Sequence, residues 1–167
     1  MVQLTQKERM LLEDQQKHEQ ICIEKYTNYA NQAQDPQLKQ IFQSYAQQEQ
    51  SHLDTINQIL NGQVPNLNQQ SQGQSQSQGQ AGQNTQASMS SNPNSAMQGA
   101  MGSAADAALC NDMLMTEKYV SNTYDTAIFE FADANVRQAL NHIQKEEQQH
   151  GEGIFNYMNQ NGMYNPQ

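Results

Sequence analysis

Two Glu-x-x-His motifs, 98 residues apart in the chain, carry residue types that bind metal ions. A further glutamate stands 30 residues before the glutamate of each motif. On a helix, residues three apart share one face about one turn apart, so the carboxylate and the imidazole of a motif can reach the same ion. The candidate ligands are Glu19, Glu49, His52, Glu117, Glu147 and His150.

The 98-residue shift also relates positions outside the motifs, which indicates one structural unit used twice. It places Asp14, Tyr26, Asp35, Gln40 and Ile56 on Asp112, Tyr124, Asp133, Gln138 and Ile154. In each half, apolar residues recur at steps of three and four on both sides of an Asp that suits a helix N-cap. This pattern predicts two antiparallel helical hairpins.

The helices are expected over residues 5–33, 36–60, 105–131 and from Asp133 to Asn161. Pro36 directly after Asp35 suits the first helical position, and glycine at 62 and 162 suits a helix end. We therefore predict an all-α four-helix bundle, with a first hairpin in residues 1–62 and a second in residues 105–167.

Residues 63–104 separate the hairpins and are rich in Gln, Ser, Asn and Gly, without a single charged residue. Such a segment buries too little apolar surface to offset its ordering entropy, so it is predicted to be a disordered crossover. Its Gln and Asn content leaves an assembly-prone tract as the alternative. A flexible chain of this length spans roughly 35 Å, close to the roughly 39 Å of a helix of about 26 residues.

The composition excludes several classes of partner. A net charge of -9 and a pI near 4.7 argue against nucleic-acid binding, which needs clustered basic residues. No apolar run at the N-terminus suits a signal peptide or a membrane span, so the protein is expected to stay in the cell. Cys22 and Cys110 do not correspond under the shift and are predicted to be small buried side chains, with cross-linking as the alternative.

The six candidate ligands interrupt otherwise apolar stripes, and burial of unpartnered carboxylates is costly. In each hairpin both glutamates stand about 15 residues from the turn, roughly 22 Å along the helix, and so at one height. The resulting set matches the dinuclear carboxylate centres of helix bundles. Four carboxylates balance two divalent ions, iron or manganese, between which these ligands do not discriminate. A metal-free polar core, held by ion pairs or hydrogen bonds, is the alternative.

Four further polar side chains need a role. Tyr26 and Tyr124 each stand seven residues after the first glutamate of their half, two turns along the same face. They are either core aromatics that need a hydroxyl partner or hydrogen-bond donors to the metal-binding carboxylates. His18 and His142 fall outside the repeat and are predicted to be surface residues.

The arrangement of ligands and tyrosines resembles the ferritin-like superfamily, which includes rubrerythrins and manganese catalases. This resemblance implies a ferritin-like four-helix bundle with a dinuclear iron or manganese centre. The long crossover departs from that superfamily and would hinder a closed storage shell. A cysteine motif for a rubredoxin-type iron centre is also missing from the sequence.

The second hairpin has a closer resemblance. The stretches from Asp112 to Tyr119, from Thr126 to Glu130 and from His142 to His150, with Gly162-Met163-Tyr164, are similar to the spore coat protein F family. The similarity covers about residues 105–167. It implies synthesis in the mother-cell cytoplasm, deposition in the spore coat and other coat proteins as partners, but it does not imply catalysis.

Two functions follow as hypotheses. The first is a structural or assembly component of the spore coat with a metal site that is retained or vestigial. The second is a di-iron or di-manganese oxidoreductase that consumes peroxide or oxidises Fe(II). Whether the chain forms a homo-oligomer is left open by the sequence.

Overall fold

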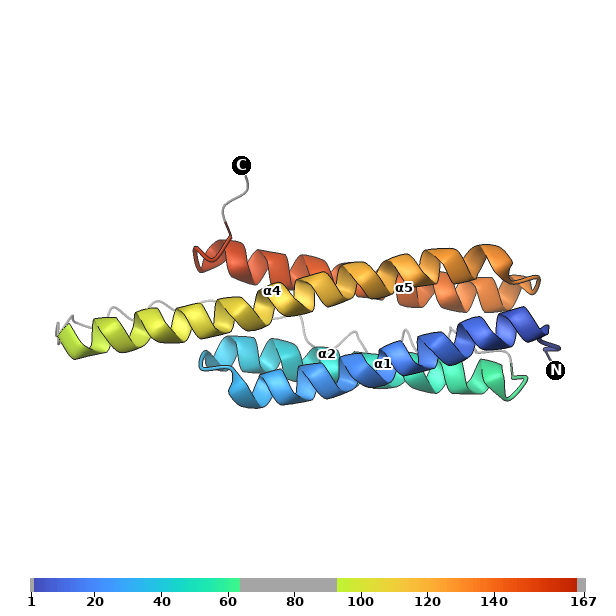
Figure 1. Cartoon of the computed structure of the whole chain (residues 1–167), viewed down its shortest axis with the longest axis horizontal. Coiled ribbons are helices and arrows are strands. Elements are labelled where there is room, and N and C mark those ends of the chain that lie inside the picture. Colours follow the sequence, from blue (N-terminus) through green and yellow to red (C-terminus); the bar gives the residue numbers. More distant parts are fainter. Residues whose placement is uncertain (1, 64–92, 165–167) are drawn as a thin grey trace, which may run out of the picture.

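The computed structural model of the protein describes residues 2–63 and 93–164, with side chains for 2–63 and 104–164. These ranges contain four helices and no strand: α1 (Gln6–Gln32), α2 (Pro36–Leu60), α4 (Pro93–Glu130) and α5 (Ala134–Gln160). Figure 1 shows two antiparallel hairpins, α1–α2 and α4–α5, lying along one common axis. The predicted all-α bundle of two hairpins is confirmed.

The helix boundaries follow from local capping. Thr5 and Glu8 form a capping box at α1, in which Glu8 N donates to Thr5 Oγ1 over 3.2 Å and Thr5 N donates to Glu8 Oε2 over 2.7 Å. Asp35 and Asp133 cap α2 and α5 through backbone N–H groups two residues on. Each second helix is followed by a glycine with positive φ, a conformation that glycine adopts without steric cost.

The predicted start of the third helix differs from the observed one. α4 begins at Pro93, not at about residue 105, so the final part of the predicted 63–104 crossover is helical. This part lacks an apolar stripe, but Ala and Met favour helix, and extending an existing helix costs less than nucleating a new one. The remainder of the predicted crossover, residues 64–92, lies outside the described residues.

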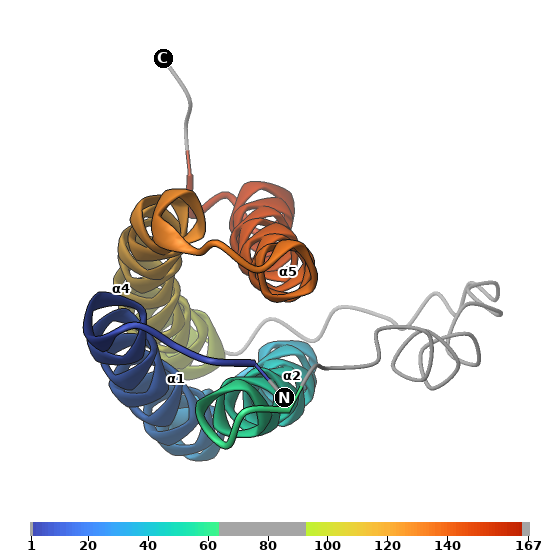
Figure 2. The ribbon, with the colours of Figure 1, turned by 90° about the vertical axis from the view of Figure 1, so that its right-hand side faces the viewer.

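The ends of α2 and α4 agree with a lengthwise crossover. α2 finishes near one end of the bundle, whereas α4 starts at the opposite end and extends past the neighbouring α1–α2 turn (Figure 1). Seen along the axis, α1 lies beside both α2 and α4 (Figure 2). None of the helices in the described ranges has a stretch both apolar and long enough to traverse a lipid bilayer.

The two hairpins cap each other's turns. Asp106 on α4 is buried and accepts hydrogen bonds from Gln34 N and Asp35 N, each over 2.9 Å. Glu8 on α1 accepts one from Ala132 N over 2.9 Å in the other turn. Glu8 and Asp106 correspond under the 98-residue shift, so the internal repeat is visible in the packing as well as in the sequence.

Two apolar clusters fill the bundle on either side of a polar middle. One cluster contains Leu12, Ile56 and Leu140, and the other contains Phe42 and Ile154. Both cysteines are buried and unpaired, as predicted from their positions. The C-terminal aromatic ring of Tyr164 packs edge-on against Phe155, with ring centroids 5.1 Å apart.

Candidate metal centre

All six candidate ligands converge in the polar middle of the bundle. α1 and α4 each contribute one glutamate, and α2 and α5 each contribute one Glu-x-x-His motif. None of the six side chains is more than 2% exposed. The residues therefore lie at one height along the bundle, where the equal distances from the two turns place them.

The donor atoms fall into two groups that share two carboxylates. One group is Glu19, Glu49, His52 and Glu147; the other is Glu49, Glu117, Glu147 and His150. Within each group, one donor atom per residue can be chosen so that all lie within 4.8 Å of one another. Glu49 and Glu147 belong to both groups, which is the arrangement expected of carboxylates that bridge two ions.

Each imidazole directs Nδ1 toward the carboxylates. His52 Nδ1 lies 3.2 Å from Glu49 Oε2 and 2.9 Å from Glu147 Oε1, and His150 Nδ1 lies 3.0 Å from Glu49 Oε1. The two rings stand 5.8 Å apart at 25° to each other. A deprotonated Nδ1 on each ring would thus face the space between the carboxylates.

The opposite nitrogen of each imidazole has a partner that sequence reasoning missed. His52 Nε2 lies 2.9 Å from Glu146 Oε2, and His150 Nε2 lies 3.0 Å from Gln48 Oε1. Such a partner fixes the tautomer and the orientation of a metal-ligating histidine. The signal in the sequence is that Gln48 and Glu146 correspond under the shift and each directly precedes the glutamate of a motif.

Tyr26 and Tyr124 donate hydrogen bonds to candidate ligand carboxylates, the second of the two predicted alternatives. Each bond crosses from one hairpin to the other. The Tyr26 hydroxyl donates to Glu117 Oε1, and the Tyr124 hydroxyl donates to Glu19 Oε1. Each tyrosine therefore orients the glutamate of the opposite half. Burial, reinforced by Glu117 beside Tyr26 and by Glu19 beside Tyr124, raises the pKa of both phenols, so both remain donors.

Several carboxylate oxygens at the centre have no hydrogen-bond partner. They are one oxygen of Glu19, one oxygen of Glu117 and both oxygens of Glu147. Glu147 Oε1 is close to His52 Nδ1 but outside hydrogen-bond geometry. Unpartnered buried carboxylates are unfavourable, and the pattern is the one expected of ligands arranged around a cation.

Burial dominates the electrostatics of these acids. It raises the pKa of Glu19 to about 7 despite the nearby His52 imidazole, and it raises the pKa of Glu147 to about 7 with further repulsion from Glu49. Burial and repulsion from Glu147 also raise the pKa of Glu117. The chain thus holds acids that resist ionisation unless positive charge is supplied.

The two histidines differ. Burial alone would lower the pKa of His52, but the hydrogen bond to Glu146 and the closeness of the Glu147, Glu19 and Glu49 carboxylates raise it well above its usual range. Burial lowers the pKa of His150 to about 4, because its attraction to Glu117 does not compensate. The two pKa values thus shift in opposite directions. The partner of Nε2 differs in the same way, since it is the Glu146 carboxylate for His52 and the neutral Gln48 amide for His150.

The donor set fits two iron or manganese ions. Carboxylates and imidazoles suit both metals, Glu49 and Glu147 would be available to both ions, and the unpartnered oxygens would offer free lone pairs. Tyr45 is a neighbour of the candidate ligands that the sequence analysis did not predict. Its ring stacks on that of His150, with 4.3 Å between the ring centroids. A Cβ at Gly153 would collide with the Tyr45 hydroxyl, so glycine there makes room for this ring.

His18 and His142 lie outside the centre, but both are half-buried rather than the fully exposed surface residues that the sequence predicts. His18 is half-buried and packs edge-on against Tyr119 at 5.4 Å. The His142 side chain is 35% exposed, and its Nε2 lies 3.4 Å from Glu146 Oε2. His142 therefore touches the residue that supports His52 rather than the candidate ligands.

Comparison with known proteins adds a family relationship for one hairpin. No curated protein and no solved structure matched the chain. A family model does match it, and the matched segment begins within α4 and continues past α5. Residues 105–167 match the model described as the Coat F domain, which supports a relationship of this protein to the spore coat protein F family and a role in the spore coat.

Proposed function

We propose that this protein is a spore coat component in which a ferritin-like bundle holds two iron or manganese ions. The coat role rests on the Coat F match of the second hairpin. The metal centre rests on one observation: two donor groups share Glu49 and Glu147 and leave buried carboxylate oxygens without partners. A polar core kept only for packing would be expected to satisfy those oxygens.

The matched hairpin holds only half of the proposed ligands. Glu117, Glu147 and His150 lie within residues 105–167, whereas the other three ligands come from α1 and α2. Neither half can complete a group of donors without the other. The metal centre would thus bind the hairpins together and stabilise the bundle in the coat.

The residues of this chain have distinct tasks in that centre. The four glutamates would hold the ions, and the Nδ1 atoms of the histidines would complete the two groups. Glu146 and Gln48 would hold the rings in orientation, and Tyr26 and Tyr124 would fix the two non-bridging carboxylates. Bound iron or manganese would supply Lewis-acid and redox chemistry at this position.

In this structural role, the protein is made in the mother cell and joins other coat proteins in the spore coat. Substitution of the metal ligands is expected to leave incorporation into the coat unchanged, provided that the variant folds. Coat fractions of spores that carry His52→Ala would show this by immunoblot. Loss of the protein from the coat, with its fold intact, would make metal binding part of assembly.

The second candidate function is a di-iron or di-manganese oxidoreductase that consumes peroxide or oxidises Fe(II). A specific feature favours it: a surface pocket between α4 and α5 reaches Glu117 and Glu147. A small reactant could therefore approach the centre without unfolding of the bundle.

Metal analysis tests the proposal directly. Protein purified from cells supplied with iron and manganese is expected to contain close to two ions per chain, and Glu147→Gln is expected to contain far less. Metal at well under one ion per chain would overturn the centre. A peroxide-consumption assay on the loaded protein then separates the roles, since bound metal without turnover supports the structural role and turnover supports the enzyme.

A further inference from the structure

A pocket of about 470 Å³ opens between α4 and α5. Two candidate ligands, Glu117 and Glu147, lie on its lining, and both are almost completely buried. Both oxygens of Glu147 and one oxygen of Glu117 have no hydrogen-bond partner. The pocket therefore extends from the surface to the residues whose carboxylates most need a cation, and the unpartnered oxygens themselves are closed off from solvent.

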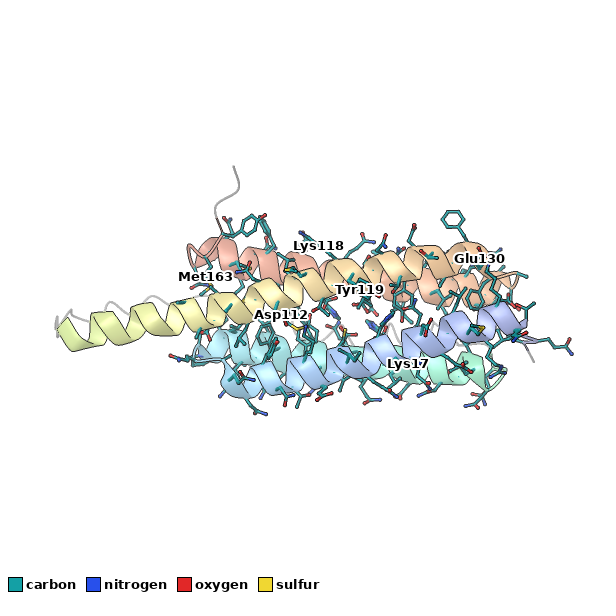
Figure 3. The ribbon with its side chains drawn as sticks, viewed as in Figure 1. Lys17, Asp112, Lys118, Tyr119, Glu130 and Met163 are labelled. Carbon is teal, nitrogen blue, oxygen red and sulfur yellow. The ribbon has the colours of Figure 1, made fainter. Side chains whose placement is uncertain are left out.

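The remaining lining combines apolar surface, to which Leu114 contributes, with several polar groups. Ser121, Asn122, Gln144 and Gln148 supply neutral groups, and Asp125 and Lys118 supply one charge of each sign. Lys118 lies on the edge of α4 toward α5, whereas Asp112 lies on the edge toward α1 (Figure 3). Hydroxyl, amide and carboxylate oxygens are the groups that hard cations bind in passing. Three acidic residues and one lysine line the pocket, and this excess of acidic groups favours cations over anions.

At two positions this side of the bundle carries smaller side chains than the corresponding positions of the other hairpin. The 98-residue shift relates Gly151 to Leu53 and Ser121 to Ile23, so small residues on α4 and α5 replace large apolar ones on α1 and α2. A Cβ at Gly151 would already stand 3.7 Å from Leu114 Cδ1 and 3.8 Å from Glu117 Cβ. A larger side chain there would extend over Glu117 and fill the pocket.

From these observations we propose that the α4–α5 pocket is the path by which divalent cations reach the centre, and that Gly151 and Ser121 keep it open. The inference rests on the proposed metal centre and adds its route of loading. A path affects how fast ions arrive and leave, but not the free energy of the bound state. Narrowing it should therefore slow binding and release by the same factor.

Two variants install the residues of the opposite hairpin: Gly151→Leu and Ser121→Ile. Mn²⁺ and Co²⁺ uptake by the full-length metal-free protein would be followed by stopped flow, and release by dilution into excess chelator. Both variants are expected to slow uptake and release by about ten-fold or more while the dissociation constant stays within about two-fold of wild type. Glu152→Gln, an exposed change on the same helix, is the matched control and should leave both rates unchanged.

The outcomes separate this inference from the metal centre itself. Wild-type protein that takes up no metal would overturn the proposed centre. Wild-type protein that binds metal, with unchanged rates in both narrowed variants, would overturn the pocket as the path and leave the centre intact. A weaker dissociation constant without slower uptake would also contradict it, because the substituted residues would then act on the bound state. If Gly151→Leu fails to fold, Ser121→Ile alone carries the same decision.

Discussion

Replacing Glu147 by Gln should make the metal-free protein more stable. In the native state this side chain is fully buried, has no hydrogen-bond partner for either oxygen, and has a pKa raised from 4.5 to about 7 by burial and by Glu49. At about pH 8 the carboxylate is ionised in both states, so the native state bears the cost of the raised pKa, about 3 kcal/mol. The neutral amide has the same shape and avoids that cost.

Part of this gain is lost because the buried amide also needs partners, so the expected increase in the free energy of unfolding is about 1–3 kcal/mol. Urea unfolding in chelator, followed by far-ultraviolet circular dichroism, measures it. At about pH 4.5 the native carboxyl is already protonated, and the difference between the two proteins should shrink toward zero. Glu152→Gln, an exposed glutamate on the same helix, should change stability by no more than about 0.5 kcal/mol at either pH.

The opposite result would refute the metal-centre reasoning at this residue. If Glu147→Gln were less stable than wild type at about pH 8 without metal, the carboxylate would be a satisfied part of a polar core. The same unfolding measurement with added Mn²⁺ is a second test, since a bound ion stabilises only the state that binds it. The ion should raise the unfolding midpoint of the wild type and leave that of Glu147→Gln nearly unchanged.

Three more outcomes follow from the geometry. The metal-free protein should lose stability as pH rises from about 4.5 to 7, because the folded-state pKa values of Glu19 and Glu147 are raised. The lowered pKa of His150 acts in the opposite sense. A urea unfolding midpoint that rises across this pH window would count against buried acids. Glu146→Gln should weaken metal binding by about 10- to 100-fold through loss of the charged partner of His52, and a calorimetric titration that gives the wild-type affinity would contradict this. Asp106→Ala should cost about 1–3 kcal/mol of unfolding free energy, because two backbone N–H groups lose their acceptor, and an unchanged melting curve would show that water replaces it.

The convergence of the six candidate ligands could be predicted from the sequence. The Glu-x-x-His motifs lie in helices with clear apolar stripes, and the equal distances of Glu19 and Glu49 from the turn predicted that these two residues lie at one height. Helical periodicity also predicted that Tyr26 would face the centre, but it did not predict the crossed bond to Glu117. Which hairpin a side chain reaches depends on how the two hairpins pack, and no spacing within one hairpin encodes that.

Other features escaped because their signal is weak or non-local. The early start of α4 at Pro93 involves residues with helix propensity but no apolar stripe, and stripes were the basis of the prediction. Asp106 looked like an ordinary polar residue, because the turn that it caps is distant in the chain. Gln48 and Glu146 correspond under the shift but differ in type, so identity across the repeat does not mark them.

The reciprocal capping by Glu8 and Asp106 has a consequence for the origin of the bundle. Each hairpin carries both an acid that caps a foreign turn and a turn that accepts such a cap. A single hairpin with these groups is complementary to a copy of itself, so two identical short chains could form the same bundle as a symmetric dimer. Covalent fusion of such copies raises their effective concentration and then lets the halves diverge, as the difference between Leu53 and Gly151 illustrates.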